Sequence, residues 1–184
     1  MDYQLKVAGL ERRLPLCPIA EDVYIAAFIM FGDVELTVNC ARALLEQAPD
    51  FDVLVTAESK GIPLLYEMAR QAGRNEYIVA RKGPKLYMRD VISTEVDSIT
   101  TDHQQILCIG GEDADRMRGK RVLIVDDVIS TGESLAALET LIHQAGGKIA
   151  GRMAVLAEGS AITRRDISYL APLPLFHADG TPIQ

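Results

Sequence analysis

Residues 122–134, with the sequence VLIVDDVISTGES, limit the fold of this 184-residue chain more than any other segment. Val122–Val125 are apolar and mostly β-branched, which is typical of a short central strand buried on both faces of a parallel sheet. Asp126 and Asp127 follow at once. Because buried carboxylates without partners are costly, we expect this pair at the open carboxyl end of the strand, facing a ligand or a metal.

The residues after the aspartates predict an anion site at the start of a helix over 135–144. They combine hydroxyl side chains with a glycine that permits an unusual backbone turn: Ser130, Thr131, Gly132, Glu133 and Ser134. A helix N-terminus stabilises an exposed anion by about 0.3–1 kcal/mol and a partly buried one by up to ~2 kcal/mol. The sequence therefore predicts a phosphate-binding turn, with the Glu133 side chain directed to solvent. The alternative is a solvated Asp-Asp turn followed by an ordinary helix cap.

Composition excludes several classes of protein. The net charge of −7 argues against a nucleic-acid-binding protein, and the three scattered cysteines, Cys17, Cys40 and Cys108, favour free thiols in a reducing compartment. No secretory signal precedes the first elements. The apolar run 23–31 is about half as long as a membrane helix, so it predicts a buried strand or an interface segment. We therefore expect a cytoplasmic protein without membrane or nucleic-acid partners.

The hydrophobic pattern predicts alternating strands and helices after an N-terminal appendage. Strands are expected over 51–56, 77–80, 122–125 and 148–156, and helices over 34–47, 62–72 and 135–144. This order favours an α/β fold with a mainly parallel sheet and ligands at its carboxyl edge. Residues 81–121 contain no convincing helix, which is typical of a lid or hairpin excursion.

A second functional turn follows the first core strand. Thr56–Gly61 reads TAESKG, and it faces the same carboxyl edge as the aspartates. Gly61 lets the backbone approach an anion, the next helix supplies free amides, and Lys60 adds a positive charge. Taken alone, the motif is weak and favours an ordinary surface turn before a helix.

The order of parts in 122–134 resembles the phosphoribosyl diphosphate (PRPP) signature of type I phosphoribosyltransferases: apolar strand, two acids, two apolar residues, a small residue, Thr, Gly, any residue, then Ser or Thr. The resemblance implies that Asp126 and Asp127 hydrogen-bond the ribose 2- and 3-hydroxyls and bind Mg²⁺, directly or through water. It also implies that residues 130–134 hold the 5-phosphate.

Two further segments carry the resemblance. Glu58, Ser59, Lys60 and Gly61 look like the pyrophosphate loop of purine enzymes, where the family often has a non-proline cis peptide, expected here within 58–60. Residues 80–86, ARKGPKL, resemble the ARKPGKLP segment of adenine phosphoribosyltransferases with Gly and Pro interchanged. This likeness implies pyrophosphate binding by three cations that offset the charge on the leaving group: Arg81, Lys82 and Lys85.

The sequence departs from the adenine pattern on the loop that follows. Adenine enzymes usually carry a Leu-Glu-Tyr-Gly segment, whereas Val96–Thr101 reads VDSITT, which looks closer to xanthine phosphoribosyltransferases and to a PRPP-binding purine repressor. Residues 1–35 are expected to form a hood that selects the base. Phe28 or Phe31 would stack on the base, although both aromatics fit a core role equally well.

The resemblance thus implies a type I phosphoribosyltransferase fold: a central mainly parallel sheet flanked by helices, a small N-terminal hood at 1–35, a core at 36–184, and a flexible β-hairpin lid. It implies PRPP and a purine base as the two substrates, Mg²⁺ as cofactor, and a homodimer. Adenine is favoured over xanthine, hypoxanthine or guanine. The groups expected to act in catalysis are Lys60, Arg81, Asp126 and Asp127. A PRPP sensor without turnover and a structural relic of the fold are the alternatives.

Overall fold

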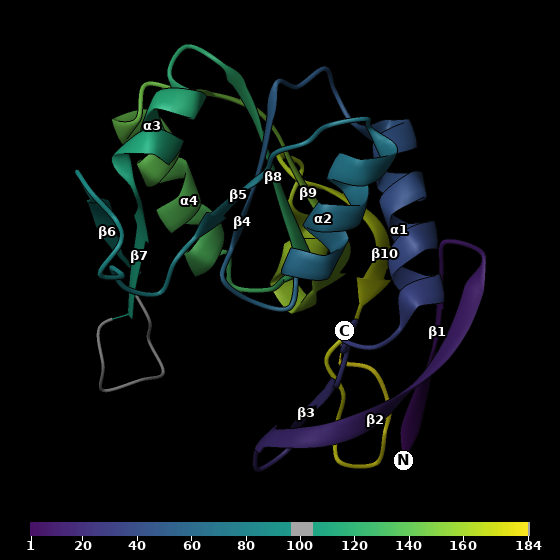
Figure 1. Ribbon diagram of the computed structural model, residues 1–184. Helices are drawn as coiled ribbons and strands as arrows, with labels where there is room; N and C mark the ends of the chain where they lie inside the picture. Colours follow the sequence, from purple (N-terminus) through teal and green to yellow (C-terminus); the bar gives the residue numbers. More distant parts are fainter. Residues whose placement is uncertain (97–104, 184) are drawn as a thin grey trace.

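The computed structural model describes residues 1–96 and 105–183, which form a parallel sheet flanked by helices and joined to a smaller N-terminal sheet (Figure 1). The central sheet has five strands in the order β10-β9-β8-β4-β5, and every neighbouring pair is parallel. Its strands are β4 (Val53–Ala57), β5 (Ile78–Ala80), β8 (Arg121–Ile129), β9 (Lys148–Glu158) and β10 (Ser168–Leu173). The expected α/β class is confirmed.

Helices cover both faces of this sheet. Helices α1 (Val34–Gln47) and α2 (Ile62–Gln71) lie on one side, and α3 (Gly111–Met117) and α4 (Glu133–Gln144) lie on the other (Figure 1). Along β8, Leu123 and Val125 belong to one hydrophobic cluster, whereas Val122 and Ile124 belong to the second. Burial of both faces explains why the sequence of β8 is continuously apolar rather than alternating.

The N-terminal residues form an antiparallel sheet of β1 (Asp2–Val7), β2 (Leu10–Ala20) and β3 (Val23–Ala26). Leu5, Leu14 and Phe28 share one hydrophobic cluster with α1, so this hood has no separate core. The apolar run 23–31 is a strand only as far as Ala26, after which buried and exposed side chains alternate. The division at residue 35 stays a prediction; α1 begins at Val34.

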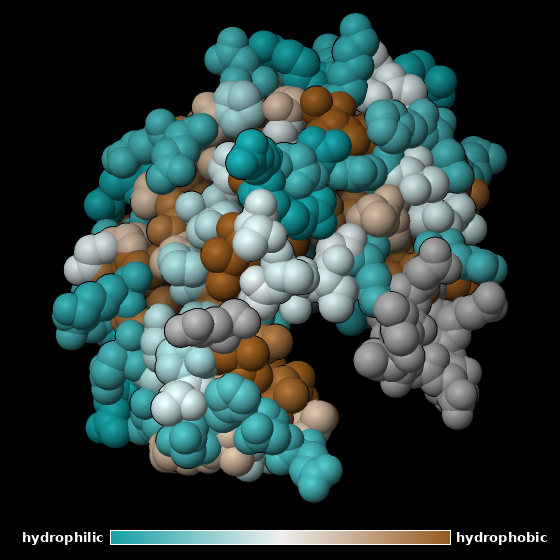
Figure 2. All heavy atoms as spheres, turned by 180° about the vertical axis from the view of Figure 1, so that it is seen from behind, coloured by the Kyte–Doolittle hydropathy of each residue, from teal (hydrophilic) through white to brown (hydrophobic). Residues whose placement is uncertain are grey.

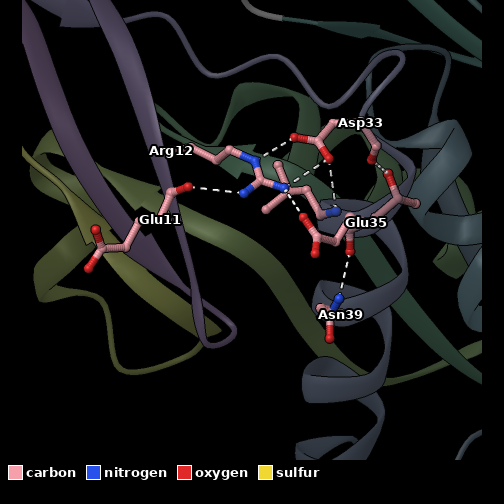
Figure 3. A network of polar contacts seen from close by, with 7 residues as sticks. Glu11, Arg12, Asp33, Glu35 and Asn39 are labelled. Carbon is pink, nitrogen blue, oxygen red and sulfur yellow. Dashed lines mark hydrogen bonds and ion pairs between the residues drawn. The ribbon is translucent and has the colours of Figure 1, made fainter.

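A polar network ties the hood to the start of α1 (Figure 3). Arg12 on β2 donates from Nε to Asp33 Oδ2 at 2.6 Å and from Nη2 to Glu35 Oε2 at 2.8 Å. Asp33 is the N-cap of α1, and its Oδ1 accepts from Leu36 N at 3.0 Å. The Arg12 guanidinium holds the pKa of the Asp33 carboxyl below its usual range. The Asp33 carboxylate therefore serves both the cap of α1 and the bridge to the hood, and Glu35 adds a second contact to that bridge.

The excursion between β5 and β8, the second and third core strands along the chain, contains the expected hairpin, made by β6 (Ile92–Val96) and β7 (Gln105–Ile109) in antiparallel pairing. Most of the segment VDSITT lies outside the described residues, so its mobility stays a prediction. Helix α3 was not predicted, because one short acidic stretch of seven residues gives little periodicity. The 3-10 turn at Gly159–Thr163 and strand β10 were also not expected.

Strand β8 is longer than the sequence suggested. It continues to Ile129, so Asp126 and Asp127 lie within its last part rather than beyond its end. Helix α4 likewise begins two residues before the expected 135, at Glu133. None of the described helices has the length and apolar character that a membrane-spanning helix needs.

Candidate active site

The predicted turns meet at the carboxyl ends of β4 and β8, which pair in parallel. Two adjoining cavities open there, of about 480 and 150 Å³, and they share Asp126, Val128, Ser130 and Ser134. The larger cavity is also lined by Ser59, Lys60, Lys82 and Asp127. The smaller one is also lined by Thr131, Gly132 and Glu133. Seen from behind, the molecule is hollowed, with hydrophobic side chains exposed on the wall of the hollow (Figure 2).

The aspartate pair is electrostatically unfavourable without a ligand. Asp127 is 3% exposed, and its Oδ2 is buried without a hydrogen bond. Asp126 Oδ1 accepts from the Asp127 amide at 2.9 Å and from Ser59 Oγ at 3.4 Å. Burial, followed by the charge of Asp127, raises the pKa of Asp126. Two carboxyls this close to each other favour a cation or hydroxyl donors between them.

Lys60 partly compensates this charge. Its Nζ lies 3.3 Å from Asp127 Oδ2, within ion-pair distance but without hydrogen-bond geometry, which agrees with the unsatisfied state of that oxygen. The same ammonium donates to the Phe28 carbonyl at 2.9 Å. Lys60 therefore links the turn after β4, the aspartate pair and the hood.

Gly61 is needed for close packing of the two turns. A Cβ at this position would lie 2.9 Å from Thr56 Oγ1 and 3.0 Å from Asp126 Oδ1. Its backbone is right-handed (φ −72°), so lack of a side chain matters here rather than conformational freedom. Every described peptide bond is trans, so the cis bond expected within 58–60 is absent.

Glu58 contacts the basic segment, of which only Lys82 lines the larger cavity. Glu58 Oε1 lies 3.0 Å from Arg81 Nη2, and its Oε2 accepts from the Lys82 amide at 2.9 Å. That amide, together with the nearby cations, lowers the pKa of Glu58. Lys82 lines the larger cavity, whereas Glu58, Gly61, Arg81 and Lys85 line neither of the two cavities. Ligand contacts by these four residues stay predictions.

The phosphate turn has the geometry of an anion site. Gly132 has a left-handed backbone (φ 86°) and is the N-cap of α4, which has no side-chain cap. The first hydrogen bond into the helix from this cap runs from the Ala136 amide to the Gly132 carbonyl, so the amides before it remain for a ligand. A Cβ at Gly132 would collide with Arg164 Nη1, and Arg164 donates from Nε and Nη2 to the Asp166 carboxylate. Glu133 is half-buried and lines the smaller cavity, so it does not point freely to solvent as expected.

The hood closes the larger cavity with Ile25–Ile29. Phe28 lines the cavity and is 3% exposed, so it also belongs to the core. Phe31 is 57% exposed and does not line this cavity. Of the two candidate stacking residues, the geometry therefore favours Phe28.

Val128 and Glu158 are among the lining residues that the sequence interpretation missed. Val128 is one of the two apolar residues between the aspartates and the phosphate turn, and it lines both cavities. Glu158 is the last residue of β9 and lines the larger cavity. The rule that identified Asp126, an acid directly after an apolar strand, would also have identified Glu158.

A magnesium ion fits the aspartate pair on structural grounds. The orphaned Asp127 Oδ2 and the Asp126 carboxyl offer hard oxygen ligands, the type that Mg²⁺ prefers. Among the described residues, no three acidic, histidine or cysteine side chains gather as a metal site. A magnesium ion here would therefore take most of its ligands from water and substrate.

Comparison with known proteins agrees with this geometry. The family model of the phosphoribosyl transferase domain matches residues 36–171. Adenine phosphoribosyltransferase of Thermotoga neapolitana is 33% identical over 153 residues, which is 78% of this chain and 81% of the relative. That of Cenarchaeum symbiosum is 32% identical over 117 residues, which is 60% of this chain and 63% of the relative, less than two thirds of its length.

The solved structures show the same fold. Adenine phosphoribosyltransferase from Saccharomyces cerevisiae, crystallised with adenine and an imino-altritol bisphosphate, superposes with a TM-score of 0.68 at 22% identity, covering 86% of this chain and 92% of that one. The structure from Giardia lamblia gives a TM-score of 0.65 at 16% identity. The match of the family model and the Thermotoga relative together show that the chain belongs to the phosphoribosyltransferase family, in its type I purine branch.

Proposed function

We propose that this protein transfers the phosphoribosyl group of PRPP to a free purine base, with adenine preferred, giving the nucleoside 5′-monophosphate and pyrophosphate. One observation carries the proposal: the aspartate pair, Lys60 and part of the phosphate turn line one cavity whose other wall is the hood. A phosphate, a ribose and a base could thus lie in sequence from the start of α4 to Phe28. The adenine phosphoribosyltransferases among the relatives support the choice of reaction.

Each part of the site has a role in this reaction. The amides at the start of α4 and the hydroxyls of the turn bind the 5-phosphate, while Asp126 and Asp127 accept hydrogen bonds from the ribose hydroxyls. Lys60 is already next to this pair and is positioned to bind an anionic leaving group. Rate acceleration would come from positioning the base against C1 and from stabilising negative charge on pyrophosphate.

We propose Mg²⁺ as the cofactor, held at the aspartate pair together with substrate oxygens. Bound there, it would neutralise charge on the diphosphate. Arg81 and Lys85 could add to this neutralisation only if the basic segment rearranges, because Arg81 is paired with Glu58 in the free protein. Glu58 then acts as a counter-ion that keeps Arg81 next to the site until an anion competes for it.

The direct test is turnover. Purified protein with PRPP and Mg²⁺ should convert adenine to AMP. Hypoxanthine, guanine and xanthine are added as competing bases, and the products are separated by chromatography. Asp127→Asn and Thr131→Ala should each weaken PRPP binding by roughly 1–3 kcal/mol, because each removes a hydrogen bond to a charged or sugar group. The matched controls are Asp115→Asn and Thr140→Ala, exposed residues far from the cavities. If calorimetry detects no heat of binding between the wild-type protein and millimolar PRPP, the proposal loses its basis.

A second candidate is a PRPP sensor without catalysis, and the missing loop glutamate in Val96–Thr101 favours it. PRPP binding with no product from any base would select this function over the first. If the protein converts xanthine faster than adenine in the same competition, xanthine becomes the proposed substrate in place of adenine. Most of that loop lies outside the described residues, so turnover must decide.

We also propose a cytoplasmic homodimer. All the cysteines are free thiols, which suits a reducing compartment. Val34, 73% exposed, and Tyr66, 56% exposed, line an apolar groove between α1 and α2 that a second copy could cover. Sedimentation equilibrium should give twice the chain mass, and Tyr66→Lys should shift the protein toward monomer.

A further inference from the structure

Glu158 is an acidic residue of the larger cavity that the reaction scheme above does not use. It is half-buried at the end of β9, and it faces the same space as the hood and the aspartate pair. Burial raises the pKa of its carboxyl, whereas the Ser130 hydroxyl and the charge of Lys60 act in the opposite direction. A carboxyl kept in such a place without an assigned role calls for a ligand.

The other charged groups that line this cavity already have assigned roles: Asp126 and Asp127 at the ribose and the metal, and Lys60 and Lys82 at the pyrophosphate. Asp127 lies beside Lys60, Asp126 accepts from Ser59 and from a backbone amide, and the Lys60 ammonium also binds the Phe28 carbonyl. Within the described residues, no cation lies at ion-pair distance from Glu158. Its carboxylate therefore retains the capacity to accept a hydrogen bond from a ligand.

The walls near Glu158 suit a flat heterocycle. Phe28 and Ile25 of the hood, Val128 after the aspartates, and Leu173 of β10 are apolar and line the same cavity. Leu173 pairs directly with Glu158 in the sheet, so the carboxyl emerges beside an apolar wall. An ionised carboxylate is an acceptor only, which matches an amino group and repels a carbonyl oxygen.

We propose that Glu158 determines base specificity by accepting a hydrogen bond from the 6-amino group of the purine and by excluding a 6-oxo group. The proposal rests on the proposed transfer to a purine base and names the residue that selects adenine within it. A 6-oxopurine would place two acceptors against each other in a half-buried site, and neither would be satisfied.

The test compares wild type with Glu158→Gln, which preserves shape but adds a donor. The ratio of kcat/KM for adenine to that for hypoxanthine should fall about 10- to 100-fold, because the amide can donate to the 6-oxo group. PRPP affinity should change less than about threefold. Glu46→Gln, at an exposed position of α1 outside both cavities, is the matched control and should leave the base ratio unchanged.

Product binding separates failure of this proposal from failure of the proposed function. Calorimetry with AMP and IMP needs no turnover, so the same loss of preference in Glu158→Gln must appear even if wild type transfers nothing. An unchanged AMP to IMP ratio overturns the role of Glu158. An equal loss for both nucleotides together with weaker PRPP binding also overturns it, because Glu158 would then only orient Ser130. Ser130→Ala should weaken AMP, IMP and PRPP binding together and should leave the ratio of AMP to IMP affinity unchanged. A thermal melt of each variant checks that it is folded.

Discussion

Replacing Asp126 by asparagine should make the free protein more stable while weakening its ligand binding. The carboxyl of Asp126 is buried beside Asp127, and burial first and then that neighbouring charge raise its pKa. Asparagine has the same shape, and its Oδ1 can still accept from the Asp127 amide, now 2.9 Å away, and from Ser59. The substitution therefore removes the repulsion and keeps the hydrogen bonds.

The magnitude follows from proton linkage. Because the folded-state pKa of Asp126 is raised, the folded chain holds this proton over a pH range in which the unfolded chain has lost it. The stability that the group contributes is present in full below the unfolded pKa of about 3.9 and is lost as pH rises through the folded pKa. Each pH unit by which the folded-state pKa exceeds the unfolded pKa corresponds to about 1.4 kcal/mol of stability. Asparagine does not titrate, so its advantage over wild type should grow with pH.

The assay is urea denaturation of wild type and Asp126→Asn at about pH 5 and pH 8. The variant should gain about 1–3 kcal/mol over wild type at the higher pH and much less at the lower one. Other carboxyls with raised pKa values, Glu158 and Asp113, are common to both proteins and cancel in the difference. Asp115→Asn, at an exposed site, should change stability by less than about 0.5 kcal/mol. Equal stability gaps at the two pH values would refute the reasoning.

Three further predictions concern Gly61, Arg12 and the segment 82–105. Gly61→Ala should weaken PRPP binding at least about tenfold in calorimetry, since its methyl group would displace Asp126. Arg12→Ala should lower the free energy of unfolding in urea by about 1–2 kcal/mol by removing the support of the α1 cap, whereas Arg13→Ala, 72% exposed, should have little effect. Hydrogen exchange over the described part of 82–105 should be faster than over β8 without ligand and should slow with PRPP.

The predictable part of this protein was contiguous in sequence. The apolar strand, the two acids and the turn before α4 occupy consecutive positions, so periodicity and residue type were enough to place them at one sheet edge. The parallel order followed from the alternation of strands and helices. Strand and helix bounds were less accurate, because β8 continues through both aspartates. Backbone pairing with β9 extends that strand. The pairing of Ile129 with Ala157 joins distant residues, so no local sequence pattern predicts it.

The unpredictable part depends on contacts between distant segments. The Lys60 ammonium binds the Phe28 carbonyl, a backbone group with no sequence signature. Glu58 belonged to a motif expected to bind anions, but its carboxylate binds Arg81 and the Lys82 amide. The run 23–31, expected as a buried strand or an interface segment, contains β3, but strands β1 and β2 of the hood were missed. Strand β2 alternates between half-buried and exposed side chains over most of its length. Such a strand is stabilised by its neighbours rather than by its own composition.

The aspartate pair explains why the free site is electrostatically incomplete. Thr56 Oγ1 and Asp127 Oδ2 are both buried without hydrogen-bond partners, at the same sheet edge where Asp126 has a raised pKa. Each unsatisfied group destabilises the free protein, and Lys60 compensates only one of them with imperfect geometry. A ligand that brings a cation and hydroxyl donors would satisfy these groups together. The same arrangement that lowers stability therefore increases affinity, since the protein does not have to break good hydrogen bonds before binding.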